Sequence, residues 1–118
     1  MENQNSKRTT WENYANAWSE TNESSRLQVL GNNLVAEATY SDPNIETIGH
    51  TDLSNYMVQF QQNFGGAKFV TTTFVEHHNQ ALIHWNMENS DGNVLVKGAS
   101  FVKFNDEKLA SMTGFFFQ

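Results

Sequence analysis

The sequence predicts an α+β fold in which three N-terminal helices pack on the concave face of a strongly bent antiparallel sheet. Apolar residues follow a helical period in the first half of the chain, and from Ala67 onward they alternate with a period of two. The alternating runs are joined by "NQ", "NSDGN" and "NDEK", which are hairpin-sized connections and require antiparallel neighbours. Helices followed by such a meander are typical of α+β domains.

The first helix is expected to begin at Thr9, which has capping-box spacing to Glu12. A second helix follows "SETNESS", and a third is expected to start at Thr51 or Asp52, either of which can cap it, and to end at Gly65. The apolar stripes of the three helices consist of Trp11, Tyr14, Ala15 and Trp18; Leu27, Leu30 and Leu34; and Leu53, Tyr56, Met57, Phe60 and Phe64.

Extended segments account for the remainder of the chain. "ATYS" is predicted to be a brief strand, and "IETIGH" a second short one after the Asp–Pro turn. The four alternating runs form the meander, with Gly98 inside the third suggesting a bulge or a sharp bend. The runs cover residues 67–78, 81–88, 94–104 and 109–117.

Length and composition limit the class of protein. The 118 residues are expected to form one domain, over 9–118, after a flexible tail over 1–8. The net charge of −6 argues against nucleic acid as a partner, because phosphate binding needs a basic surface. There is no cysteine, no apolar leader and no run long enough to span a membrane, so we expect a cytoplasmic protein without a membrane partner.

The C-terminal segment "GFFFQ" indicates a partner chain. Strand alternation divides its three phenylalanines between both faces of the sheet. Large exposed apolar patches are rare in monomers, so we expect a homodimer formed through the sheet.

Several motifs, taken in their order along the chain, resemble those of a known superfamily. They read "W-x-x-Y-x-x-A-W-S-E", "Y-S-D-P", "F-x-x-x-F-G-G", "E-H-H", "D-G" and "G-x-x-F", from about Thr9 to Phe117. The chain resembles SnoaL-like, polyketide-cyclase-related proteins within the NTF2-like (ketosteroid isomerase-like, cystatin-like) superfamily. That resemblance implies a cone-shaped sheet around an apolar pocket. It leaves activity open, because the superfamily includes isomerases, cyclases, epoxide hydrolases and transport factors.

The resemblance implies a role for Asp42, which follows the first short strand. It would point into the pocket mouth, at the position of the general base in the isomerase branch. The alternative is an Asx-turn, in which the carboxylate accepts a backbone N–H beside Pro43. Tyr14 matches the tyrosine that stabilises an oxyanion in that branch; the alternative for Tyr14 is core packing.

The run "ALIHWNME" places His84 and Asn86 on one face, together with Leu82. That face fits either a pocket wall or a solvent-facing surface; within a pocket, His84 is a candidate acid or base. Glu76 and His78 alone share a side of the preceding run. Two ligands are too few for zinc, so we expect neither a metal nor a cofactor.

Two activities known in the superfamily require residues that this chain does not have. The isomerase branch needs a second acid on the third strand of the meander, where the matching position falls near Ser100. The epoxide hydrolase branch needs an Asp-Arg-Asp network, and the last strand, "LASMTGFFF", contains no acid. We therefore expect neither ketosteroid isomerase nor epoxide hydrolase activity.

The sequence thus predicts a pocket for a small apolar, cyclic or aromatic molecule. If it is an enzyme, cofactor-free proton transfer (an isomerase, cyclase or dehydratase) fits, with Asp42 or His84 as base and Tyr14 at the oxyanion. The rival hypothesis is a non-catalytic ligand-binding or dimeric assembly module. The expected ligand-binding residues are Trp18, Phe60, Phe64, Asn86, Ser100 and Met112.

Overall fold

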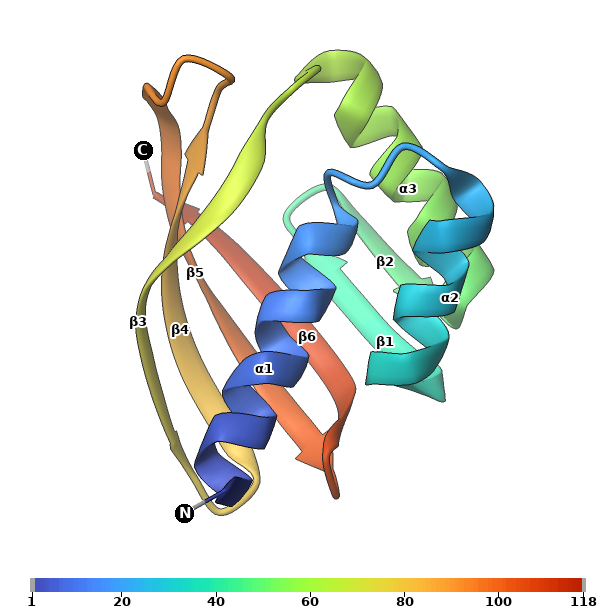
Figure 1. Cartoon of the computed structure of the whole chain (residues 1–118), viewed down its shortest axis with the longest axis vertical. Coiled ribbons are helices and arrows are strands. Elements are labelled where there is room, and N and C mark those ends of the chain that lie inside the picture. The colour runs from blue at the N-terminus through green and yellow to red at the C-terminus, as the bar shows by residue number, and fades with distance from the viewer. Residues whose placement is uncertain (1, 118) are drawn as a thin grey trace.

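The computed structural model describes the backbone of residues 2–117 and the side chains of residues 6–117. Two helices, two strands, a third helix and four further strands follow one another along the chain, as the colours of Figure 1 show. The helices are α1 (Glu2–Ala17), α2 (Glu23–Asn33) and α3 (His50–Asn63). The strands are β1 (Leu34–Asp42), β2 (Ile45–Ile48), β3 (Lys68–His77), β4 (Gln80–Glu88), β5 (Val94–Asn105) and β6 (Lys108–Phe117). No helix within the described residues is long and apolar enough to cross a membrane.

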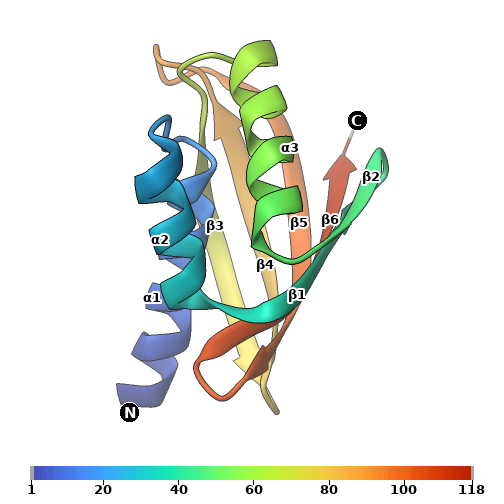
Figure 2. The same ribbon diagram turned by 90° about the vertical axis from the view of Figure 1, so that its right-hand side faces the viewer.

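The strands form one sheet in the order β2-β1-β6-β5-β4-β3. Strands β3 to β6 make the expected antiparallel meander, and the helices lie on one side of the sheet (Figure 2). The α+β prediction with helices on one face is therefore confirmed. The sheet is mixed rather than wholly antiparallel, because β1 pairs in parallel with β6 and antiparallel with β2.

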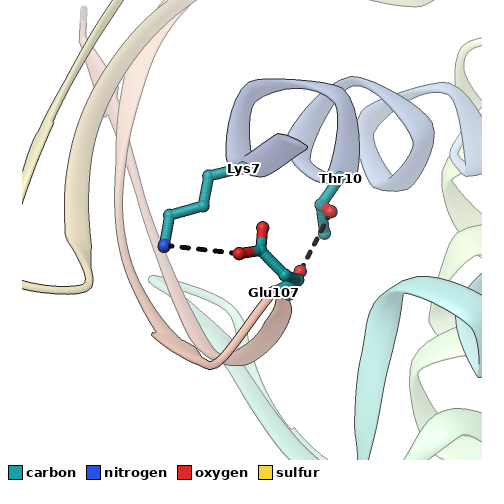
Figure 3. Close-up of polar contacts among 3 residues, drawn as sticks. All are labelled: Lys7, Thr10 and Glu107. Atoms are coloured by element: carbon teal, nitrogen blue, oxygen red, sulfur yellow. Dashed lines mark hydrogen bonds and ion pairs between the residues drawn. The ribbon is translucent and has the colours of Figure 1, made fainter. Parts of the chain in front are cut away.

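Helix α1 extends further towards the N-terminus than the helix expected from Thr9. Residues 2–8, where the sequence suggested a flexible tail, belong to this helix; Met1 lies outside the described residues. The Thr10 hydroxyl donates to the Glu107 carbonyl at 3.0 Å, and the Lys7 ammonium lies 3.9 Å from the Glu107 carboxylate (Figure 3). These contacts attach α1 to the turn between β5 and β6.

Two further boundaries differ from expectation. Strand β1 starts at Leu34 and is nine residues long, because the chain leaves the helical conformation directly after Asn33. Helix α3 starts at His50 after Gly49, whose φ of 85° favours glycine, and no side chain caps it. The expected caps at Thr51 and Asp52 are therefore wrong.

The core lies between the helices and the concave face of the sheet. Strand β4 directs Ile83, Trp85 and Met87 into it. Gly98 pairs with Trp85 across the β4–β5 ladder without a register shift, so of the two predicted alternatives, a bulge or a sharp bend, the bulge is absent. A Cβ at this position would collide with the Trp85 ring and the Phe115 carbonyl. Gly98 thus provides the space for the indole of Trp85.

Candidate functional site

A cavity of about 310 Å³ opens between the helices and the concave face of the sheet. Its wall is mostly aromatic, and polar side chains lie near Asp42 and along one side of α3. The lining residues are Trp11, Tyr14, Ala15, Trp18, Tyr40, Asp42, Asn44, Tyr56, Gln59, Phe60, Asn63, Phe64, Phe69, Trp85, Met87, Val96, Ser100, Gly114 and Phe116.

Asp42, the last residue of β1, is the charged side chain of this wall. The Tyr40 hydroxyl donates to Asp42 Oδ2 at 2.6 Å, and the Tyr56 hydroxyl donates to the same oxygen at 3.1 Å. The Asn44 backbone N–H donates to Oδ1 at 2.8 Å. Asp42 therefore closes an Asx-turn and also borders the cavity. The turn fixes one oxygen, and two phenols hold the other.

Three tyrosines near this carboxylate keep their protons over a wide pH range. Burial raises the pKa of Tyr14 above its usual range, and the charge of Asp42 raises it further. Burial also raises the pKa of Tyr40, with Tyr14 and the hydrogen bond to Asp42 adding to the effect. Partial burial and the charge of Asp42 raise the pKa of Tyr56. All three are therefore neutral hydrogen-bond donors at physiological pH.

The aromatic wall is built around Trp18, at the end of α1. Its ring lies 5.4 Å from that of Tyr40, 5.9 Å from that of Tyr56 and 5.5 Å from that of Phe60, measured between centroids. On the opposite side, the Trp85 indole donates to the Ser100 hydroxyl at 3.0 Å. These contacts hold rings from a helix and a strand in fixed positions around the cavity.

The structure places six of the nine predicted site residues in the cavity wall: Tyr14, Trp18, Asp42, Phe60, Phe64 and Ser100. His84 and Asn86 do not line it. They alternate with the inward residues of β4 and therefore lie on the outer face, where His84 Nδ1 lies 2.9 Å from the Thr73 hydroxyl. Met112 is buried in the core and also does not line the cavity. The predicted pocket placement of His84, Asn86 and Met112 is thus wrong.

Sequence reasoning missed the two phenols that hold Asp42. Tyr40 precedes Asp42 by two residues on a strand, so both side chains point to the same face, and the motif contained this signal. Tyr56 was placed on the apolar stripe of the third helix, but its contact with Asp42 depends on how α3 packs against β1. The other cavity rings that the sequence did not identify are Trp11, Phe69, Trp85 and Phe116.

Metal-ligating side chains do not gather at this site or elsewhere in the part of the chain that the structure describes: no three His, Asp or Glu residues lie close enough together to hold an ion.

A family model for the SnoaL-like domain matches residues 11–112, which is most of the chain and includes the whole Asp42 cluster. The chain belongs to the SnoaL-like family. A search of curated proteins gave no significant match.

Solved structures share the fold. A candidate isomerase of the SnoaL-like family from Agrobacterium tumefaciens is 23% identical, with a TM-score of 0.88 over 97% of this chain and 99% of that one. A candidate SnoaL-like polyketide cyclase from Jannaschia is 10% identical, with a TM-score of 0.78 over 95% and 85%. A Catenulispora acidiphila protein with a ketosteroid isomerase-like fold, in complex with trimethylamine, is 18% identical, with a TM-score of 0.72 over 89% and 82%.

Proposed function

We propose that the cavity of this SnoaL-like protein binds a small apolar, cyclic or aromatic molecule and that Asp42 transfers a proton to or from it without a cofactor. The observation that carries the proposal is the Asp42 carboxylate, held by two phenols at an aromatic cavity. A positioned carboxylate beside a largely apolar site is suited to general acid–base catalysis. The reaction classes are those of an isomerase, a cyclase or a dehydratase.

Oxyanion stabilisation is assigned to Tyr14. Its side chain is buried in the cavity wall, and its raised pKa keeps it a phenol that can donate a hydrogen bond. Tyr40 and Tyr56 have a different role, because their hydroxyls already donate to Asp42 and fix its orientation. Ser100 is a second donor candidate, since it borders the cavity and its oxygen accepts from Trp85.

The likeness to the solved structures supports this proposal at the level of reaction class. Two of them are candidates for isomerase and polyketide cyclase activity, which are among the reaction classes proposed here. The trimethylamine complex of the Catenulispora protein supports small-molecule binding by this fold.

The test is hydrogen exchange at carbon in deuterated water, followed by NMR on a panel of cyclic ketones and enones. Asp42→Asn is expected to slow exchange about 10²- to 10⁴-fold, because it removes the proton acceptor but keeps the shape of the side chain. Glu37→Gln is the matched control, since Glu37 is an exposed carboxylate on β1 outside the cavity. Binding without any exchange above that of buffer would contradict the catalytic part.

The second candidate function, a dimeric assembly or ligand-binding module, is favoured by a separate observation. Four large apolar side chains are exposed on the outer face of the sheet, opposite the cavity; we call them the outer-face patch, and they are Val75, Leu82, Phe115 and Phe117. We propose that a second copy of the chain covers this patch, because a two-fold contact pairs the same surface with itself. Such a dimer leaves the cavity open and is compatible with either function.

A further inference from the structure

We infer that the otherwise apolar ligand of this cavity also carries one positive charge, as a protonated amine or an alkylammonium group. The inference rests on the proposed small-molecule function and specifies the chemical class of the ligand. Its basis is the charge of the cavity wall, the absence of a counter-ion in that wall, and the aromatic rings that line the cavity.

The cavity wall carries a net charge. Asp42 is the only ionisable acid or base among the lining residues apart from the tyrosines, and no lysine, arginine or histidine lines the cavity. Because the pKa values of Tyr14, Tyr40 and Tyr56 are raised, these phenols stay neutral. The wall therefore carries one negative charge.

This charge has no cationic partner among the described residues. The ion pairs there join Lys7 to Glu107 and Arg8 to Glu12, and Asp42 takes part in neither. The donors to Asp42 are two phenols and a backbone N–H, which orient the carboxylate but leave its charge uncompensated. A cationic ligand would supply the missing counter-charge, and an anionic ligand would be repelled.

The cavity wall is also mostly aromatic. Ring faces carry negative electrostatic potential and attract ammonium groups, most strongly where water is excluded. Trp18 is the central ring of this wall, with Tyr40, Tyr56, Phe60 and Phe69 all within 6 Å of its centroid. Rings alone would accept a neutral apolar ligand equally well. It is the combination of rings with one uncompensated carboxylate that selects a cation.

Overall charge and cavity size agree with this choice. The chain has a net charge of −6, so its field attracts cations towards the surface. A volume of about 310 Å³ lies at the lower end of ligand pockets, which favours a small compound.

The test compares three probes of nearly the same shape by NMR titration of the tryptophan indole N–H signals. The probes are choline, its uncharged isostere with a tert-butyl group in place of the trimethylammonium group, and the tert-butylacetate anion. Choline is expected to bind at least about tenfold more tightly than the isostere, with the anion weakest. Nuclear Overhauser contacts from the choline methyl groups to the ring protons of Trp18 would place it in the cavity.

Two variants test whether the Asp42 charge causes the preference for choline over its uncharged isostere. Asp42→Asn is expected to weaken choline binding at least about fivefold and to leave the isostere unaffected. Glu37→Gln removes the same charge from the same strand outside the cavity and should keep the preference. Should Asp42→Asn fail to fold, the comparison of the three probes on the unmodified chain still decides.

Each remaining outcome is informative. Equal binding of choline and its isostere, or an undiminished preference in Asp42→Asn, overturns the inference and leaves the small-molecule function intact. If none of the probes, and none of the cyclic ketones and enones, shifts the indole signals, both proposals fail.

Discussion

At the residue scale, Asp42 shows how two local roles combine in one side chain. One carboxylate oxygen accepts the turn N–H of Asn44, and the other accepts two phenols. The turn therefore acts as the positioning device for the group that borders the cavity. The hydrogen bond to Asn44 is enough to form the turn, and the hydrogen bonds from Tyr40 and Tyr56 additionally fix the second carboxylate oxygen.

The buried phenols predict a dependence of stability on alkaline pH. In the unfolded chain a tyrosine ionises near pH 10, whereas burial keeps Tyr40 protonated in the folded chain well above that value. The unfolded state then binds fewer protons, so the free energy of unfolding falls as the pH rises above about 10. Each such tyrosine contributes at most about 1.4 kcal/mol per pH unit.

Tyr40→Phe is expected to flatten this alkaline slope by one group and to lower stability at neutral pH by about 1 kcal/mol, because Asp42 loses a donor. Urea unfolding measured between about pH 9 and about pH 11 checks both effects. Tyr56→Phe is the matched control: Tyr56 also donates to Asp42, but it is only half-buried and should change the slope less. An unchanged slope in Tyr40→Phe would show that this phenol ionises normally when folded.

The limits of prediction are also visible at this scale. Asp42, Tyr14 and four of the expected ligand-binding residues could be identified from motifs and periodicity. His84 and Asn86 could not be placed, because alternation divides a strand into two faces without saying which face is buried. The structure shows that the face with Trp85 is the buried one, because the Trp85 indole occupies the space that Gly98 leaves on the inner face.

At the scale of the elements, pairing that is distant in sequence was the least predictable feature. The meander followed from alternation and short connections, but the parallel contact of β1 with β6 has no local signal. The same contact explains why β1 is longer than expected, since its pairing with β6 begins at Leu34, opposite Leu109. Helix ends were likewise misplaced where no side chain caps them, as at His50.

Gly98→Ala tests the packing of β5 against the cavity wall. The added methyl group would collide with Trp85 and with the Phe115 carbonyl, so we expect a loss of about 1–3 kcal/mol and a displaced indole. Chemical denaturation and the Trp85 indole N–H signal measure the two effects. Gly31→Ala is the matched control, because it lies within α2 with open space around it and should stabilise the protein by roughly 0.5–1 kcal/mol.

At the scale of the whole molecule, the two faces of the sheet carry different chemistry. Phe116 lines the cavity, whereas Phe115 and Phe117 belong to the outer-face patch, so consecutive phenylalanines serve opposite surfaces. The inner face accounts for the proposed binding function, and the outer face for the proposed dimer. Substitutions on one face should therefore leave the other intact.

Leu82→Glu is expected to convert the proposed dimer into a monomer, because it places a charge within the outer-face patch. Light scattering after size exclusion should give twice the chain mass of 13.4 kDa for the unmodified protein and the single mass for the variant. Gln28→Glu is the control, because it adds the same charge at an exposed position of α2, on the helix side of the sheet. A monomer in the unmodified protein would contradict the dimer and leave the cavity proposals unaffected.

The parallel pairing of β1 with β6 also has a consequence for synthesis on the ribosome. Tyr40 lies opposite Met112, and Gly114 of β6 lies close to both Tyr40 and Asp42. Until β6 has been translated, β1 has only β2 as a partner, and one of its edges is open to other chains. The nascent chain therefore carries Asp42 and its tyrosines long before they can form a pocket, because the cavity cannot be completed until β6 has been synthesised.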